Sequence, residues 1–193
     1  MLKKALFNKK ILLILIITFF LLSQYVFATT CPLKGDLFPD ITLKVPKTEG
    51  DKLYLGLEEK QAFKISDIKS EIIIIEIFSM YCPYCQKEAP IVNELFDKIN
   101  KNLELKDKIK LLGIGAGNTQ FEVDIFRENF KIEFPLIPDE EFLIHKAIGE
   151  VRTPYFFVIK KINNKNNIIY SNVGTIGNPE NFLNMIINNS TSK

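Results

Sequence analysis

Cys82 and Cys85, in the sequence CPYC, are the residues of this 193-residue chain whose types and spacing best suit chemistry. The pair follows the apolar run IIIIEIF at 72–78, which predicts a strand buried on both faces. A helical pattern begins at Pro83, so Cys82 falls in the turn before a helix N-terminus, where unpaired N–H groups and the helix dipole favour a thiolate. We therefore predict that Cys82 attacks a disulfide and that the more buried Cys85 resolves the mixed disulfide.

Glu76 is the second candidate catalytic residue. It is the only charged residue within the predicted strand, and it lies six positions before Cys82. Burial would raise the pKa of its carboxyl group and would suit it to exchange a proton with Cys85. The alternative is an edge position from which the side chain reaches solvent.

Thr153 and Pro154 form the third candidate site. A proline directly before the run YFFVI is out of place in a central strand. It makes sense if the peptide bond is cis and lies beside the cysteines, so that the Thr153 backbone is free to pair with a substrate strand. The alternative is an ordinary turn at the start of a strand. Tyr81 and Tyr84 flank the thiols, and we expect them to contact substrate protein, to pack against Phe78 and the proline loop, or both.

The rest of the sequence alternates between strand and helix patterns. Strands are predicted at 53–57, 62–65, 72–78, 109–117, 134–139, 152–160 and 168–174, the last two joined by an Asn- and Lys-rich loop at 163–167. Helical segments are predicted at 66–70, 83–100 with a kink at Pro90, 119–130 with Asn118 or Thr119 as its cap, 140–149 and 178–188. This order predicts an α/β fold with a central mixed β-sheet flanked by helices, parallel in its first half and antiparallel in its last hairpin.

Residues 1–28 have the pattern of a signal peptide or membrane anchor. Four lysines and no acid in 1–10 precede an apolar run at 11–22. That run is short for a spanning helix, which needs about 20 apolar residues. Cleavage, retention as an anchor and lipidation at Cys31 stay open. We predict export to the periplasm or the outer face of the cytoplasmic membrane, a linker at 29–35 and one domain at 36–190.

Charge and ligand types exclude two other classes of function. The formal charge of +2 falls to −2 without the lysines of residues 1–28, and no basic cluster suited to nucleic acid is left. A zinc site needs four ligands, and beyond the cysteine pair the chain offers only Cys31 and His145. We predict no metal and no cofactor. A structural disulfide between Cys82 and Cys85 would close too small a loop to stabilise the fold much.

The pattern around the cysteines resembles the thioredoxin fold over about residues 36–190. Thioredoxins have a buried acid six residues before the first cysteine, where this chain has Glu76. They have a kink proline five residues after the second, matched by Pro90. They also have a cis proline facing the pair, matched by Pro154, and a Val-Gly before the last helix, matched at 173–174.

Within that superfamily, the sequence GDLFPDITL at 35–43 resembles the extended N-terminal opening of the TlpA-like family of exported thiol:disulfide oxidoreductases. YCPYC stands where that family usually has WCPPC. The resemblance implies an N-terminal β extension and reduction of disulfides in protein substrates. It also implies a membrane thiol electron carrier as the donor, with cytochrome c maturation among the pathways.

Two alternatives accompany this interpretation. The stretch EIFSMYCPYC also resembles the active site of DsbA-type oxidants, and the Pro-Tyr pair between the cysteines is of the glutaredoxin type. DsbA-type proteins carry a long helical insertion between the cysteines and the cis proline. Here the 72 residues from Cys82 to Pro154 hold a helix–strand–helix unit and little more. The second alternative is a thioredoxin-like binding module that has kept its cysteines without catalysis.

Overall fold

The computed structural model describes residues 30–163 and 165–191. The segment 1–28, for which the sequence predicts a signal peptide or anchor, lies outside the described residues. Within the described ranges, no helix combines the length and the apolar character that crossing a membrane requires.

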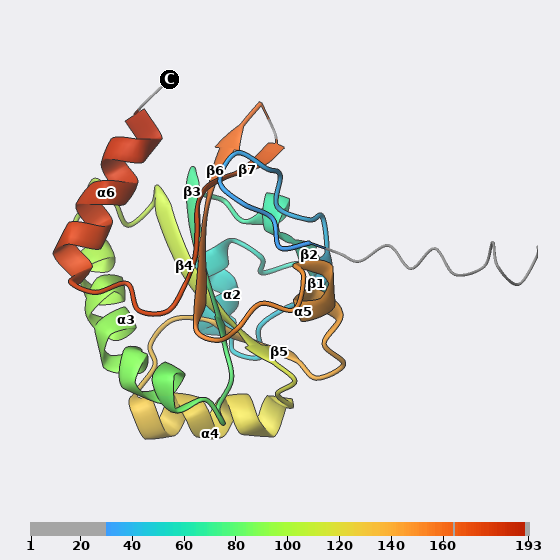
Figure 1. Cartoon of the computed structure of the whole chain (residues 1–193). Helices are drawn as coiled ribbons and strands as arrows, with labels where there is room; N and C mark the ends of the chain where they lie inside the picture. The colour runs from blue at the N-terminus through green and yellow to red at the C-terminus, as the bar shows by residue number, and fades with distance from the viewer. Residues whose placement is uncertain (1–29, 164, 192–193) are drawn as a thin grey trace, which may run out of the picture.

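A central mixed β-sheet forms the middle layer of the domain, with strand order β5-β4-β3-β6-β7 (Figure 1). Its strands are β3 (Ile72–Phe78), β4 (Ile109–Ala116), β5 (Leu136–Asp139), β6 (Tyr155–Ile162) and β7 (Lys165–Val173). The pairs β3–β4 and β4–β5 are parallel, whereas β6 is antiparallel to both β3 and β7. The predicted division into a parallel half and an antiparallel hairpin is confirmed. Because β7 begins at Lys165, the hairpin loop is shorter than the predicted 163–167.

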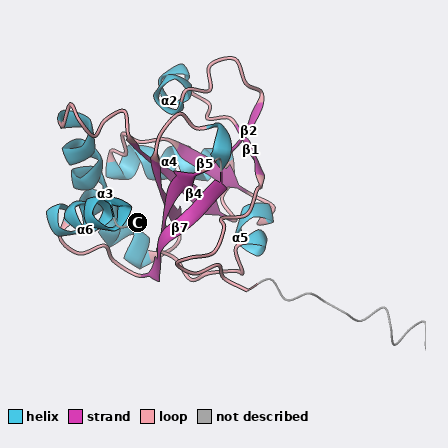
Figure 2. Ribbon diagram, turned by 90° about the horizontal axis from the view of Figure 1, so that it is seen from above, coloured by secondary structure: helices cyan, strands magenta, loops and turns pink. Residues whose placement is uncertain are grey.

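Helices and a small sheet cover the two faces of the central sheet. One face carries α3 (Pro83–Lys101), α4 (Gln120–Phe130) and α6 (Pro179–Thr191), whose apolar side chains share one hydrophobic cluster. The other carries β1 (Thr42–Lys44), α2 (Glu49–Leu55), β2 (Ala62–Lys64), the 3-10 helix η1 (Ile65–Asp67) and α5 (Leu143–Ala147). Seen from above, α3 and α6 lie on one side of the sheet, and α5 lies with β1 and β2 on the other (Figure 2).

Alternation along β3 decides which way its side chains point. Successive residues of a strand face opposite sides of the sheet. Ile72, Ile74 and Phe78 belong to the cluster under α3, whereas Ile73, Ile75 and Ile77 belong to the cluster on the other face. The same alternation turns the even-numbered residue 76 toward α3, the helix that carries the cysteines.

The N-terminal extension pairs with the far edge of the sheet. The backbone N–H of Gly35 donates to the carbonyl of Ile168, and that of Phe38 donates to the carbonyl of Asn166, each at 2.8 Å. Further along the chain, β1 and β2 pair antiparallel as a separate two-stranded sheet. The N-terminal β extension that the TlpA-like resemblance implies is therefore present.

The strand predicted at 53–57 is wrong, because this segment belongs to the end of helix α2 and the turn after it. Thr48 caps the helix by accepting a hydrogen bond from the backbone N–H of Asp51 at 3.0 Å. Gly56 ends it with φ of 70°, a left-handed conformation that glycine adopts readily. The alternation of leucines that predicts a strand also buries Leu55 as part of a helical face.

The helix predicted at 140–149 is shorter in the structure, where α5 begins only at Leu143. Phe142 has a left-handed backbone with φ of 55°, so the preceding turn is not helical. The carboxylate of Asp139 accepts hydrogen bonds from the backbone N–H groups of Ile144 at 3.1 Å and His145 at 2.8 Å. From the end of β5, the Asp139 side chain therefore accepts hydrogen bonds from N–H groups in the first turn of α5.

Candidate active site

Cys82 is the N-cap residue of α3, as the sequence predicts. The chain enters α3 from the turn that follows β3 (Figure 1). Its Sγ accepts a hydrogen bond from the backbone N–H of Cys85, with an N···S distance of 3.4 Å. Pro83 occupies the first turn of the helix, where its missing N–H costs no hydrogen bond. The sulfur of Cys82 thus lies at the positive end of the helix dipole, which favours a negative charge on it.

The pKa of Cys82 lies below the ordinary value of a cysteine. Burial opposes ionisation of this half-buried thiol, but hydrogen bonds outweigh the burial. They involve Thr153, the thiol of Cys85 and the backbone N–H groups of Cys85 and Tyr84. When protonated, the thiol donates to the backbone carbonyl of Thr153 at an S···O distance of 3.3 Å. Cys82 is therefore both reachable and readily ionised.

Cys85 has the opposite properties. Its side chain is fully buried, and burial is the main cause that raises its pKa. Interactions with Cys82 and the negative charge of Glu76 raise it further, whereas a backbone hydrogen bond at Ser79 lowers it. Both cysteines are free thiols in this structure. The geometry thus suits Cys82 to the role of an attacking thiol, and it keeps Cys85 protonated until another group removes its proton.

Glu76 is buried beneath the cysteine pair, with 2% of its surface exposed. Its Oε1 atom has no hydrogen-bond partner among the described residues. Burial first, and then the negative charges of Glu88 and Cys82, raise the pKa of Glu76 to about 8. An edge position from which Glu76 reaches solvent is therefore ruled out, and the carboxyl group is neutral over most of the physiological range.

Glu88 is a second buried carboxyl group near the thiols, and the sequence analysis does not single it out. It lies one helical turn after Cys85, is 3% exposed, and its Oε1 accepts a hydrogen bond of 2.7 Å from the backbone N–H of Ile176. The available signal is the i, i+3 spacing, which puts the two side chains on one helix face. Its backbone partner is 88 residues away along the chain, so no local pattern marks it as buried.

The Thr153–Pro154 peptide bond is cis. It lies directly beside the thiols, since the Thr153 carbonyl is the atom that contacts Cys82. The carbonyl of Pro154 accepts a hydrogen bond of 2.8 Å from the backbone N–H of Gly174, which joins this segment to the end of β7. The cis geometry that the sequence suggests is present, and the first ladder residue of β6 is Tyr155.

Two hollows open on either side of Thr153, and each is bordered by one of the tyrosines that flank the thiols. The first has a volume of about 410 Å³ and includes Tyr84 and Pro154 in its lining, and the second, of about 510 Å³, includes Tyr81. Tyr81 and Tyr84 are 67% and 71% exposed. The hydroxyl of Tyr81 donates to a carboxylate oxygen of Glu122, which raises the pKa of Tyr81. Both rings are thus available at the surface around Cys82.

Asn118 binds the backbone of the turn that precedes Cys82, a role that the sequence analysis misses. Its side chain is fully buried, and its Oδ1 accepts a hydrogen bond of 2.9 Å from the backbone N–H of Met80. The carbonyl of Met80 in turn accepts from the side-chain amide of Gln86 at 2.8 Å. Asn118 and Thr119 are both plausible caps for α4 by sequence, and the structure assigns the cap to Thr119. Asn118 is free to turn inward instead.

Cys31 and His145 make local contacts, and His145 also lines the second hollow with Tyr81 and Thr153. The thiol of Cys31 donates to the hydroxyl of Tyr155 at 3.2 Å. The Nε2 atom of His145 is 2.8 Å from the carbonyl of Val151. Among residues 30–163 and 165–191, no group of three or more His, Cys, Asp and Glu side chains gathers as a metal site requires.

Known proteins are similar to this chain in sequence and in fold. The Redoxin family model matches residues 33–186. The chain is similar to the thiol-disulfide oxidoreductase ResA of Geobacillus thermodenitrificans, at 25% identity over 117 residues, which cover 61% of this chain and 64% of that protein. It therefore spans a little under two thirds of the length of this relative.

Solved structures share the fold at low identity. The thioredoxin domain of a thiol-disulfide oxidoreductase from Bacteroides vulgatus superposes with a TM-score of 0.60 at 11% identity, covering 80% of this chain and 99% of that one. StoA from Bacillus subtilis superposes with a TM-score of 0.56 at 19% identity, covering 77% and 98% of the two chains. These similarities concern the fold alone.

Proposed function

This chain belongs to the redoxin family of the thioredoxin superfamily, and we propose that it is an extracytoplasmic thiol:disulfide oxidoreductase that reduces disulfides in other proteins. One observation carries the proposal: Cys82, half-buried and with a lowered pKa, lies beside Cys85, fully buried and with a raised pKa. Such a difference separates an attacking thiol from a resolving thiol. The name of the similar ResA protein supports the same class of reaction.

The first step is attack on the substrate. The Cys82 thiolate attacks one sulfur of the substrate disulfide, so a mixed disulfide forms while the bond between the two substrate sulfurs breaks. The second substrate sulfur leaves as a thiolate and takes up a proton. We assign to Thr153 and Pro154 the pairing with the substrate backbone, and to Tyr81 and Tyr84 contacts with its side chains. Each of the four lines at least one of the hollows beside Thr153, whose carbonyl contacts Cys82.

The second step is resolution by Cys85. Glu76 removes the thiol proton of Cys85, directly or through water, and the new thiolate attacks Cys82. The Cys82–Cys85 disulfide forms, and the first substrate sulfur leaves as a thiolate that takes up a proton. Because the charge of Cys82 is one cause of the raised pKa of Glu76, formation of the mixed disulfide removes that contribution. Glu76 therefore ionises more readily at the stage where a base is needed.

The cycle transfers two electrons and two protons to the substrate. It leaves Cys82 and Cys85 oxidised, so a dithiol donor must reduce them again. For this donor we propose a membrane thiol carrier, reached at the outer face of the cytoplasmic membrane. The basic and apolar residues 1–28 support export, with membrane contact through that segment if it is retained. No step needs a metal or a cofactor.

An oxidant of the DsbA type is the second candidate, and one observation favours it. The interactions that lower the pKa of Cys82 stabilise its thiolate and therefore the reduced form of the pair. Stabilisation of the reduced form makes a couple more oxidising. The same residues would then accept electrons from substrate thiols by the reverse of the two steps. The TlpA-like resemblance favours reduction.

The reduction potential of the Cys82–Cys85 couple tests the proposal. It is measured by equilibrating the purified protein in glutathione or dithiothreitol buffers and quantifying the two redox forms. A potential near or below about −230 mV supports a reductase, and one near about −120 mV supports the oxidant. The lack of any reversible two-electron couple would contradict both and leave a non-catalytic binding module.

A further inference from the structure

The hollows on either side of Thr153 share one charged residue, Arg152, which lines both of them. It comes directly before Thr153, whose backbone carbonyl contacts the attacking thiol. A polypeptide that pairs with the Thr153 backbone must therefore pass within reach of the Arg152 side chain. The charge of this residue can act on whatever flanks the substrate cysteine.

The two cations that line the first hollow have side chains without an ionic partner in the described part of the chain. Arg152 and Lys87 both line it and are both exposed, and the side chain of neither makes an ion pair or hydrogen bond with any residue in 30–163 or 165–191. The one acidic residue in this lining is Glu88, which is buried and bound to the backbone N–H of Ile176. No exposed carboxylate in the lining therefore competes for the two positive charges.

The rest of the same hollow is mostly apolar. Tyr84 is 71% exposed and Val173 is 49% exposed, and Pro154 lies with them in the lining. Exposed aromatic and aliphatic side chains that border a cation suit a ligand combining apolar surface with negative charge. Arginine also matches a carboxylate well, because its planar guanidinium can donate two parallel hydrogen bonds to it.

We propose that this groove selects substrate polypeptides that carry an aspartate or glutamate, together with an apolar residue, next to the cysteine that Cys82 attacks. Arg152 binds the substrate carboxylate with help from Lys87, while Tyr84, Pro154 and Val173 cover the apolar residue. This inference rests on the proposed oxidoreductase function and names the substrate class of the same site. It adds no redox step, because the charge acts on encounter and binding.

Single-turnover reduction of matched peptide disulfides tests the inference. Two peptides are used that differ only by Asp or Asn directly before the cysteine, each with a leucine on the other side. The reduced full chain is mixed with each peptide disulfide, and the second-order rate of peptide thiol release is measured. Dithiothreitol reduces the same two peptides in parallel, which corrects for their intrinsic reactivity. Bis(2-hydroxyethyl) disulfide serves as a small, uncharged substrate whose reduction does not depend on binding in the groove.

After this correction, we expect the Asp peptide to react about three to ten times faster than the Asn peptide at low salt, the range expected for a rim charge pair. The ratio should shrink at high salt, since exposed charges are screened. In the Arg152→Gln and Lys87→Gln double variant it should fall to near one. The Lys98→Gln variant should keep the wild-type ratio, because Lys98 lies on α3 like Lys87 but does not line the groove.

Equal corrected rates for the two peptides would overturn the inference while the reduction of bis(2-hydroxyethyl) disulfide upholds the proposed function. A preference for the Asp peptide that survives in the double variant would overturn the assignment to Arg152 and Lys87. Failure to reduce either peptide or the small disulfide would overturn the oxidoreductase function, and the inference with it.

Discussion

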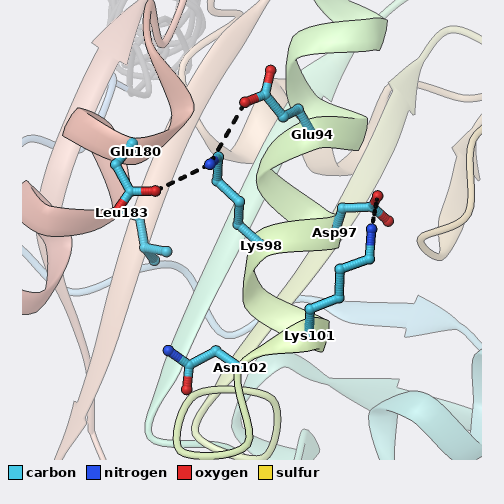
Figure 3. A pocket seen from close by; sticks show the side chains of 7 residues that line it. All are labelled: Glu94, Asp97, Lys98, Lys101, Asn102, Glu180 and Leu183. Carbon is cyan, nitrogen blue, oxygen red and sulfur yellow. Dashed lines mark hydrogen bonds and ion pairs between the residues drawn. The ribbon is translucent and has the colours of Figure 1, made fainter.

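Helix α3 borders a charged hollow at each of its ends, and the two hollows differ in how their charges are partnered. At its C-terminal half, facing α6, the hollow has a volume of about 680 Å³ (Figure 3). Lys98 lies 3.1 Å from Glu180 and 3.7 Å from Glu94, and Lys101 lies 2.6 Å from Asp97. At its N-terminal end, Lys87 and Arg152 have no such partners among the described residues, although the hollow there is smaller.

The larger hollow is therefore the one whose lysines are paired with carboxylates, and the smaller hollow beside the cysteines is the one whose cations are unpaired within the described residues. Between α3 and α6, both lysines are paired with carboxylates, so the described residues leave no unpaired positive charge there for a ligand. Around the cysteines, an oxygen of Glu76 has no hydrogen-bond partner in the described part of the chain, the pKa of Cys82 is lowered, and Tyr84 is exposed. Unsatisfied and perturbed groups gather where a substrate is to complete them.

The largest expected effect comes from removing the attacking thiol. Cys82→Ser should abolish turnover of protein disulfides, because a serine hydroxyl does not form the thiolate that begins the reaction. Turnover is followed as release of substrate thiols with dithiothreitol as electron donor, after subtraction of the rate without protein. The matched control is Cys31→Ser, whose thiol contacts Tyr155 and not the cysteine pair, and which should keep its turnover. Turnover that persists without Cys82 would contradict the proposed mechanism.

A smaller effect is expected from the buried acid. Glu76→Gln should slow resolution of the mixed disulfide about 100-fold, the usual order for loss of a positioned base. In the wild type, this rate should rise with pH as the carboxyl group ionises and should level off below about pH 8, because the mixed disulfide removes the Cys82 charge that helps to raise the pKa of Glu76 to that value. The variant should lack that plateau, because its own Cys85 must lose a proton unaided. The measurement is stopped-flow quenching of a preformed mixed disulfide at Cys82 over a series of pH values.

The stability of the same variant provides the control. Folded Glu76 keeps its proton up to about pH 8, whereas a glutamate in the unfolded chain ionises around its ordinary pKa of 4.5. Between these pH values the folded state binds more protons, so the free energy of unfolding should fall as pH rises. Glu76→Gln lacks this contribution, so its stability relative to the wild type should increase from about pH 5 to about pH 8. Parallel urea-unfolding curves across this range would indicate that Glu76 has an ordinary pKa.

Much of the site follows from the sequence because its signals are local. Alternation within 72–78 is enough to place Glu76 on the face that the cysteine helix covers, and the cap position of Cys82 follows from the strand-to-helix turn. Pro154 is recognisable because a proline conflicts with the strand that follows it. The domain therefore has the fold that the sequence predicts, apart from the strand predicted at 53–57, where a helix cap outweighs the alternation of leucines.

The residues that the sequence analysis misses depend on contacts between distant segments. Asn118 is buried because it reaches Met80, 38 residues earlier, and Glu88 because it reaches Ile176. In a sequence alone, both resemble ordinary polar residues at helix ends or on helix faces. Arg152 is a different case. Its side chain has no ionic partner among the described residues, and only the folded structure reveals this.

The smallest effect is expected in the hollow between α3 and α6, where the charges are paired. Lys98→Gln should change the free energy of unfolding by less than about 1 kcal/mol, because exposed ion pairs contribute little. Lys98 and Glu180 are both partly exposed, at 34% and 56% of their side chains, so solvent screens their attraction. Urea unfolding at low and at high salt measures the change, and the difference should vanish when salt screens the pair.

The single-turnover rates of Lys98→Gln on the Asp and Asn peptides should equal those of the wild type. A fall of the Asp-to-Asn rate ratio in Lys98→Gln as large as that in the Arg152→Gln and Lys87→Gln double variant would mean that the pairing of charges does not distinguish the two ends of α3.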